Sequence, residues 1–282
     1  MKHLTISVIG AGGKMGQRIT ANLRRQPHRL LLVEKAEAAV AKLREQGLKV
    51  SAAADAVPAS DVVILAVPDA AMAAVSADVV PRMRPGAVAI LLDPAAAHND
   101  EVRLRDDCSF VVTHPCHPPL FGEQDTLEAR RDFFGGIHAK QDIVVALHRG
   151  TEESYRLAEA ICREMFAPVV NTHRITVEQM AMLEPAMAEV CAASAAKLMK
   201  DALDEAIARG VPAEAARSFM LGHAQIPLAI VFGEIPSPFS DAAKIAMQVG
   251  AERVIRSDWR SVFEPAEIRT TIHRMLHHGG RR

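Results

Sequence analysis

The stretch "LTISVIGAGGKMGQRI", residues 4–19, decides the fold of this chain. Its apolar run over residues 4–10 predicts a buried strand, and the pattern over residues 14–26 predicts a helix. A tight turn from strand to helix needs residues that tolerate positive φ and let backbone segments approach closely. The turn contains four such residues, Gly10, Gly12, Gly13 and Gly16. The stretch therefore predicts the first strand–turn–helix unit of an α/β sheet.

The glycine turn also predicts a ligand. Its glycines have the spacing G-x-x-G-x-x-G, and Gly12 adds a G-x-G alternative. Backbone N–H groups and the positive end of the helix dipole at such a turn hold an anion such as a pyrophosphate. We therefore assign a dinucleotide phosphate site to Gly10, Gly12, Gly13, Lys14, Met15 and Gly16. A purely structural turn is the alternative interpretation.

An acid follows where it can distinguish two dinucleotides. Glu34 ends the second apolar run about 20 residues beyond the turn, where a carboxylate binds both ribose hydroxyls of NAD and repels a 2′-phosphate. Lys35 follows directly and weakens this preference without reversing it. Pro68 and Asp69 end the third run at the expected cofactor crevice, although a simple strand-ending turn would also explain Asp69. The pattern favours NAD over NADP.

The first half of the chain alternates short apolar runs with helical patterns. Runs that are apolar throughout indicate a sheet covered on both faces, and their alternation with helices indicates a parallel, doubly wound Rossmann sheet. The strands are expected over residues 4–10, 29–34, 61–68, 86–94, 109–115, 142–150 and 167–173. The helices are expected over residues 14–26, 38–47, 70–83 and 152–166. We predict an NAD-binding domain over residues 1–174.

The second half is helical throughout. Helices are expected over residues 177–210, 212–233 and 240–257, the first of them broken at Pro185. We predict an all-helical substrate and dimerisation domain over residues 175–282. Its alanine- and methionine-rich helices need a covering partner, so we expect a homodimer formed through residues 177–270. His277 and His278 are expected in a frayed, solvent-exposed tail rather than as ligands.

Composition excludes several classes of function. The 33 basic and 34 acidic residues leave a net charge of −1, which predicts no attraction to nucleic acid or to an anionic membrane. No apolar run reaches the roughly 18 residues that a membrane helix needs. The glycine cluster near the start replaces the cleavage site of a signal peptide. Four cysteines without a C-x-x-C pair favour a reduced, cytoplasmic compartment.

Two histidines in "FVVTHPCHPPLFGEQDT", residues 110–126, predict the chemistry. His114 and His117 are expected on a proline-stiffened loop after a strand, and loops at the carboxyl ends of such strands line the ligand crevice. Two neutral imidazoles and one carboxylate can hold a divalent metal ion, with zinc, magnesium and manganese all possible. We expect Glu184, before Pro185 in the helical half, to be the third ligand.

Several roles for these side chains stay open. Either His117 or Glu184 can be the base that removes a hydroxyl proton. One histidine could instead cap a turn while the other acts without a metal ion, and both could be structural. Glu189 lies about 140° around an α-helix from Glu184 and is not expected to share the site. His223 is expected to be a satisfied core histidine, with a substrate contact as the alternative.

The motifs resemble those of a known group of enzymes. "GAGGKMG" and "DVVILAVPD" are similar to β-hydroxyacid, 6-phosphogluconate, prephenate and pyrroline-carboxylate dehydrogenases and reductases. The catalytic lysine of the β-hydroxyacid dehydrogenases is missing; its place falls near Glu184 and Pro185, and Lys197 does not match it. "HPCHPPLFGE" and "EQMAMLEPAMAE" instead resemble a smaller family, phosphogluconate-dehydrogenase-like in its C-terminal domain, that includes D-apionate oxidoisomerase.

The resemblance implies a specific reaction on a sugar acid. NAD would oxidise the 2-hydroxyl of an aldonate such as D-apionate, and a metal-assisted α-ketol rearrangement would then give 3-oxo-isoapionate. A metal-free prephenate- or imine-type oxidoreductase that uses His114 alone is the first alternative. A nucleotide-sensing protein without catalysis is the second, although the clustered polar groups disfavour it.

Overall fold

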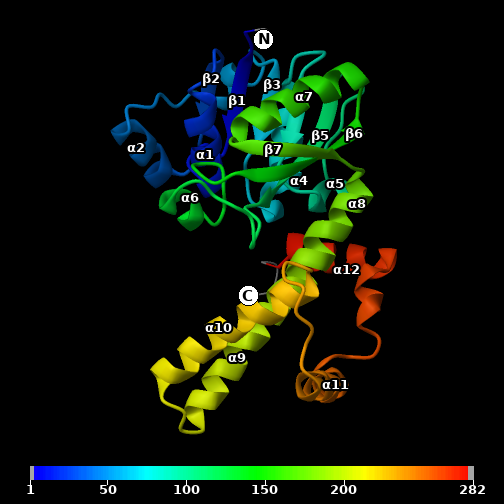
Figure 1. Cartoon of the computed structure of the whole chain (residues 1–282). Helices are drawn as coiled ribbons and strands as arrows, with labels where there is room; N and C mark the ends of the chain where they lie inside the picture. The colour runs from blue at the N-terminus through cyan, green and yellow to red at the C-terminus, as the bar shows by residue number, and fades with distance from the viewer. Residues whose placement is uncertain (1–2, 279–282) are drawn as a thin grey trace. The chain divides into compact units, whose positions relative to one another are not determined.

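The structure, a computed structural model, describes residues 3–278 and divides the chain into two compact units (Figure 1). The first unit runs to Ala181 and takes up the chain again at Arg269, whereas the second spans Met182–Ile268. The boundary lies after Ala181 rather than at the predicted residue 174, because the helix over Val177–Ala181 packs against the strand over Gln141–Arg149 of the first unit. The end of the last helix also belongs to the first unit. Ile272 and Leu276 of that helix are buried there.

The first unit is built on a seven-stranded sheet with the order β2-β1-β3-β4-β5-β6-β7. The strands are β1 Thr5–Ile9, β2 Arg29–Val33, β3 Val62–Leu65, β4 Val88–Leu91, β5 Ser109–His117, β6 Gln141–Arg149 and β7 Val169–Arg174. Strands β1 to β5 pair in parallel, and the order reverses between β1 and β3, as in a doubly wound sheet. The predicted Rossmann sheet is confirmed.

Two strands depart from the expected parallel arrangement. β6 pairs antiparallel with β5, and β7 is parallel to β6, so both run against the other five strands. A parallel connection needs a crossover that packs a helix across the sheet. Residues 118–140 contain only the short helix α6, Leu127–Arg131, and the chain returns alongside β5 instead.

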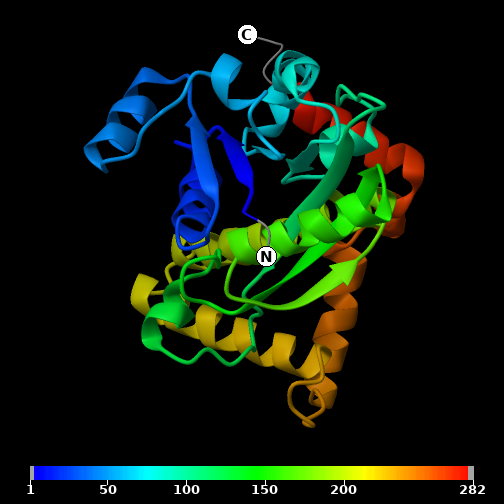
Figure 2. The same ribbon diagram turned by 90° about the horizontal axis from the view of Figure 1, so that it is seen from above.

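Helices cover both faces of the sheet (Figure 2). Helices α1 and α7 pack together on one face, and α4 and α5 lie on the other. Their bounds are α1 Lys14–Leu23, α2 Glu37–Glu45, α3 Ala53–Ala56, α4 Asp69–Val79, η1 Val80–Arg82, α5 Ala95–His98, α7 Glu152–Met165 and α8 Val177–Ala181.

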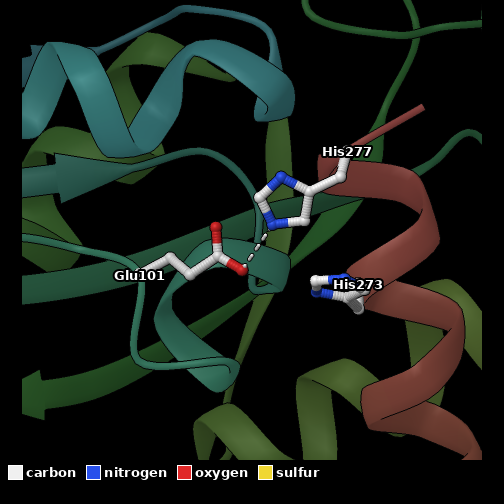
Figure 3. Close-up of side chains that lie close together, drawn as sticks. All are labelled: Glu101, His273 and His277. Atoms are coloured by element: carbon white, nitrogen blue, oxygen red, sulfur yellow. Dashed lines mark hydrogen bonds and ion pairs between the residues drawn. The ribbon is translucent and has the colours of Figure 1, made fainter. Parts of the chain in front are cut away.

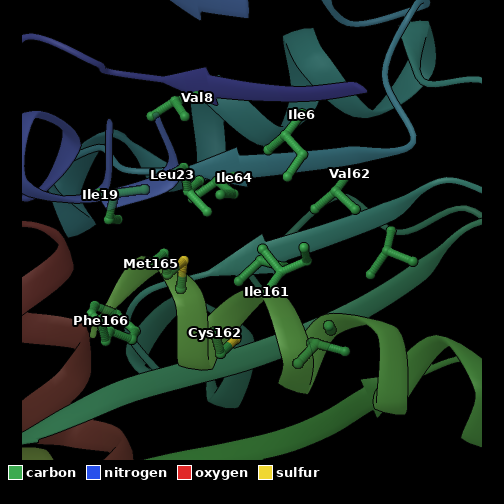
Figure 4. Packing of buried hydrophobic residues seen from close by; sticks show 14 of the residues in the cluster. Ile6, Val8, Ile19, Leu23, Val62, Ile64, Ile161, Cys162, Met165 and Phe166 are labelled. Carbon is green, nitrogen blue, oxygen red and sulfur yellow. The ribbon is translucent and has the colours of Figure 1, made fainter. Parts of the chain in front are cut away.

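The main core lies between the sheet and the α1–α7 pair (Figure 4). Ile6, Val8 and Ile64 project from the strands and are fully buried. Helix α1 contributes Ile19 and helix α7 contributes Ile161 to the same cluster. Full burial of each such side chain stabilises the fold by about 1.5–3 kcal/mol, so the cluster holds helices α1 and α7 firmly on the sheet.

The second unit is helical, as predicted. Its elements are η2 Met182–Ala193, α9 Ser194–Ala208, α10 Ala213–Val231, α11 Asp241–Val254 and η3 Trp259–Phe263, and helix α12, Pro265–Leu276, ends in the first unit. The predicted break at Pro185 is wrong, because the helix continues through it as a π-helical turn over Met182–Ala193. A wider turn accommodates a proline ring that would clash in an α-helix.

Two expectations about the helical half have different outcomes. His223 is not a core residue, because it is exposed and stacks on Phe219 with ring centroids 3.8 Å apart. His277 and His278 are exposed, as expected, although the chain is helical up to Leu276; residues 279–282 lie outside the described residues.

Lys197 and Lys200 are exposed and pair with Asp201 and Asp204.

The surface of the second unit is unusually apolar. Large hydrophobic side chains are exposed on its helices, among them Leu198, Phe219, Leu221, Ile226, Val231, Phe232 and Ile245. A groove of about 310 Å³ between α9 and α10 is lined almost entirely by apolar groups, including Leu203, Val211 and Phe219. Within residues 3–278, no helix is long and apolar enough to cross a membrane.

Candidate functional site

The glycine turn after β1 has no room for side chains. Gly10 has a φ of +80°, and a Cβ there would lie 2.4 Å from the carbonyl oxygen of Ala66. A Cβ on Gly16 would lie 2.2 Å from the carbonyl oxygen of Gly10. Helix α1 starts at Lys14, and no described side chain caps the N–H groups of its first turn. The turn therefore has the close backbone approach and the N–H donors that suit a pyrophosphate.

Glu34 lies against this turn, as the sequence predicts. Its Oε2 accepts the Gly12 N–H at 2.9 Å, and its Oε1 accepts the N–H groups of Lys35 at 2.8 Å and Ala36 at 3.0 Å. The Lys35 ammonium lies 3.7 Å from the carboxylate of Asp78. Lys35 therefore has another carboxylate as its partner, and an acid at the position of Glu34 suits the ribose hydroxyls of NAD.

The turn after β3 lies beside the glycine turn. β3 ends at Leu65, and the close approach of Gly10 to Ala66 holds the following residues next to the cofactor turn. Pro68 precedes helix α4, and Asp69 is its first residue. The role of Pro68 and Asp69 in binding the cofactor stays a prediction.

His114 and His117 are in a strand rather than on the expected loop. β5 runs through His117, because β6 pairs along it and Asp142 lies opposite His117. The Nδ1–H of His114 donates to the carbonyl oxygen of Pro115 at 2.9 Å. Since a carbonyl oxygen can only accept, Nε2 is the unprotonated nitrogen. Burial lowers the pKa of His114 to about 4, so the imidazole is neutral at neutral pH.

Asp93 joins His114, and sequence reasoning missed it. It follows β4, the neighbour of β5, and one of its carboxylate oxygens lies within 4.8 Å of a His114 ring nitrogen. Its Oδ1 also accepts the N–H of Ala95 at 2.8 Å. An acid at the end of the strand expected over residues 86–94, directly before Pro94, was the available signal. A neutral imidazole beside a carboxylate can hold a divalent cation.

His117 faces a different environment. It has a φ of +62°, and its Nδ1–H donates to the carbonyl oxygen of Phe134 at 2.9 Å. Its ring stands edge-on to that of His114, with centroids 5.7 Å apart. It lines a pocket of about 390 Å³ together with Cys116, Gln141 and Asp142. Among the described residues, no cluster of three potential ligand atoms within 4.8 Å includes His117.

The loop that contacts His117 is tied to the cofactor helix. Arg18 of α1 forms an ion pair with Asp132 at 3.2 Å and also donates to the carbonyl oxygen of Gly135. Asn22, one turn further along α1, donates to the carbonyl oxygen of Gly136 at 2.8 Å. The Phe134 carbonyl therefore has a fixed position, and so does the ring of His117.

Glu184 lies in the second unit on the π-helical turn and is half-buried. Pro185, which follows it, is buried, and Glu189 is exposed. The α-helical angle that separates Glu189 from Glu184 does not apply to a π-helical turn, because its hydrogen bonds join residues five apart. The different exposure distinguishes the two acids instead. The role of Glu184 as metal ligand or base stays a prediction.

Comparisons with known proteins agree with this geometry. A family model described as the C-terminal part of phosphogluconate dehydrogenase (decarboxylating) matches residues 122–276. A second, the NAD-binding domain of 6-phosphogluconate dehydrogenase, matches residues 5–106. A D-apionate oxidoisomerase of Rhizobium rhizogenes is 44% identical over 271 residues, which cover 96% of this chain and 98% of that protein.

Solved structures extend the similarity to the fold. A semialdehyde dehydrogenase NAD-binding protein from Cupriavidus necator, in complex with calcium and NAD, is 43% identical with a TM-score of 0.93, over 98% of this chain and 100% of that one. A crystal structure from Jannaschia sp. CCS1 is 38% identical with a TM-score of 0.92, over 98% of this chain and 100% of that one.

The glycine turn generates the first prediction. Gly16→Ala should weaken NAD binding at least about tenfold, because its Cβ would collide with backbone atoms that cannot move aside without opening the turn. Titration with NAD by calorimetry measures the effect. Gly222→Ala is the matched control, since no described atom lies within 4 Å of a Cβ there. Equal affinities of both variants would contradict the assigned cradle.

The buried imidazole generates the second prediction. The pKa of His114 is lowered to about 4 from an ordinary 6.5, so the unfolded chain binds this proton first as pH falls. Between about pH 6.5 and 4 this residue should therefore remove on the order of 2–3 kcal/mol from the free energy of unfolding. Urea unfolding in EDTA at several pH values, compared between wild type and His114→Gln, isolates the contribution of His114 to the free energy of unfolding. Parallel pH profiles of the two proteins would contradict it.

Proposed function

Because the chain belongs to the phosphogluconate dehydrogenase C-terminal family, we propose that it is an NAD-dependent oxidoisomerase of the sugar acid D-apionate. The observation that carries the proposal is the similarity, over nearly the whole chain, to a relative of that activity. The cofactor turn and the polar groups at the ends of β4 and β5 support it. A dehydrogenase needs such groups beside its nicotinamide.

The cofactor site fits NAD on the geometry of this chain. Gly10 and Gly16 leave open the space that the pyrophosphate needs, and the first turn of α1 supplies N–H donors. Glu34 would bind the ribose hydroxyls in place of its present backbone donor, Gly12. When bound, NAD supplies the hydride acceptor for the oxidation.

We further propose that a divalent metal ion binds at Asp93 and His114. The hydrogen bond from Nδ1–H to Pro115 leaves the His114 Nε2 lone pair for a cation. Glu184 of the second unit is proposed as the third ligand, and His117 as a ligand or as the base. The ion would supply Lewis acidity toward the substrate carboxylate and hydroxyl groups. Mixed nitrogen and oxygen donors accept zinc, magnesium or manganese.

The residues of the chain then account for the proton transfers. His117, held on Phe134 through Nδ1, would accept the proton of the 2-hydroxyl through Nε2 while hydride leaves that carbon. In the rearrangement that follows, one carbon group moves to the new carbonyl carbon as a neighbouring hydroxyl becomes the ketone. That step is an isomerisation and needs no further reactant, because the proton removed from one oxygen is returned to the other.

The pKa of His114 disfavours the metal-free alternative. A prephenate- or imine-type mechanism with His114 as its only base needs an imidazole that titrates near neutral pH. Burial instead lowers its pKa to about 4, which makes it a weak base and a ready metal ligand.

We also propose that the enzyme is a cytoplasmic homodimer. Large apolar side chains are exposed on α9, α10 and α11, among them Leu198, Phe219 and Ile245, and a second copy would cover them. Cys108, Cys116, Cys162 and Cys191 all have free thiols, which suits a reducing compartment.

Turnover of a substrate panel tests the proposed reaction. Purified protein with NAD should reduce the cofactor with D-apionate faster than with linear aldonates, and EDTA should abolish turnover until a divalent ion is restored. His117→Gln should lower kcat by about 10²–10⁴-fold, the usual contribution of a positioned base. His138→Gln is the control, because His138 is an exposed histidine on the loop that contacts His117. NAD binding without reduction by any hydroxy acid would favour a sensor instead.

Light scattering after gel filtration tests the dimer. Wild type should elute as a dimer, and Phe219→Glu should shift it toward the monomer because the new charge would be buried in an apolar contact. Gln225→Glu adds the same charge to α10 about 120° away around the helix and should have a smaller effect. A monomeric wild type would contradict the proposal.

A further inference from the structure

A second cluster of side chains with potential metal-ligand atoms lies within the first unit and shares no residue with the proposed active site (Figure 3). Glu101 lies three residues after helix α5, and His273 lies on the last turn of α12. His277 directly follows α12, and its N–H donates to the carbonyl oxygen of His273 at 3.1 Å. One potential ligand atom from each side chain lies within 4.8 Å of the other two. The Nε2 atom of His277 is 3.1 Å from the Oε1 atom of Glu101.

The arrangement follows from helix geometry and from packing. Residues four apart lie on one face of a helix, so His273 and His277 present their rings together, with centroids 4.4 Å apart. Ile272 and Leu276 are buried and hold the same helical turns on the first unit. The imidazole pair therefore has a fixed position on the unit that carries Glu101.

Hydrogen bonds hold the loop after α5 against Arg269, in the first half of α12. The side chain of Asn99 donates to the carbonyl oxygen of Arg269 at 3.2 Å, and the guanidinium of Arg269 donates to the carbonyl oxygen of His98 at 3.3 Å. Arg269 also lies 3.9 Å from the carboxylate of Asp100. Glu101 is the next residue, so these contacts hold its carboxylate near the histidines without help from an ion.

We infer that Glu101, His273 and His277 bind a divalent transition-metal ion such as zinc, which fastens the end of α12 to the loop after α5. Two imidazole nitrogens and one carboxylate oxygen are a common zinc donor set, and two histidines four apart on a helix are a recurrent part of it. With bonds of about 2.1 Å, tetrahedral ligand atoms are about 3.4 Å apart, which small side-chain rotations here would reach.

An ordinary surface ion pair is the competing explanation. It accounts for the contact of His277 with Glu101, which would be worth roughly 0–1 kcal/mol. It does not account for the convergence of His273 on the same point. The side chains of His277 and Glu101 are 51% and 22% exposed, which leaves an open side for a water molecule as the fourth ligand.

Zinc binding to the full chain, without a polyhistidine tag and stripped of metal, tests the inference. All variants carry His114→Ala, which removes a ligand of the proposed active-site ion. Zinc binding is measured by calorimetry and by thermal unfolding. We expect one zinc equivalent and a rise in Tm, since an ion that binds only the folded state stabilises it. His277→Ala, His273→Ala and Glu101→Gln should each weaken binding at least about tenfold, a loss that even outer-sphere partners can cause.

His278→Ala is the matched control, because His278 is the adjacent residue and its Nδ1 bonds to the carbonyl oxygen of Met275 instead. This variant should bind zinc as tightly as the His114→Ala protein from which it is made. The inference fails if the double variant His273→Ala/His277→Ala keeps the same stoichiometry and affinity, or if His278→Ala loses as much as His277→Ala. Circular dichroism confirms that each variant is folded. No turnover is measured, so the result does not depend on the proposed reaction.

Discussion

The in-register parallel pairing of β1, β3, β4 and β5 is the constraint on which the site depends. Val8, Ile64, Ile90 and Val111 lie side by side across these strands and are all fully buried. Their chain neighbours Val63, Ala89 and Phe110 point to the opposite face and are equally buried, because helices cover both faces of the sheet. Since the strands pair in parallel, their carboxyl ends meet at one edge. The glycine turn, the turn at Pro68, and Asp93 beside β5 all lie along it.

Backbone carbonyls then determine what the two imidazoles can do. Pro115 and Phe134 each accept an Nδ1–H, so His114 and His117 have the same tautomer and present Nε2. Their surroundings differ, because His114 is desolvated next to Asp93 whereas His117 borders an open pocket. One residue type therefore supports two proposed roles, a metal ligand and a proton acceptor, which differ mainly through burial and the neighbouring carboxylate.

The end of the chain belongs to the architecture of the first unit. The chain leaves that unit at Ala181, forms the second unit, and returns at Arg269. The returning helix is held by apolar contacts of Ile272 and Leu276 and by polar contacts with the loop after α5. Asp93 caps the start of α5 and Glu101 follows its end, so this short helix connects the proposed active site with the proposed zinc cluster.

Features that depend on neighbouring residues could be predicted from the amino-acid sequence. The strand–turn–helix of residues 4–19, the acid at Glu34, the apolar strands and the helical second half all follow from local periodicity and from glycine geometry. The antiparallel β6, the proximity of Asp93 to His114 and the contact of Glu101 with His277 became visible only in the folded chain. Those pairs join residues that are not neighbours in the chain. The periodicity of side chains along one segment does not indicate which other strand or helix end will lie beside it.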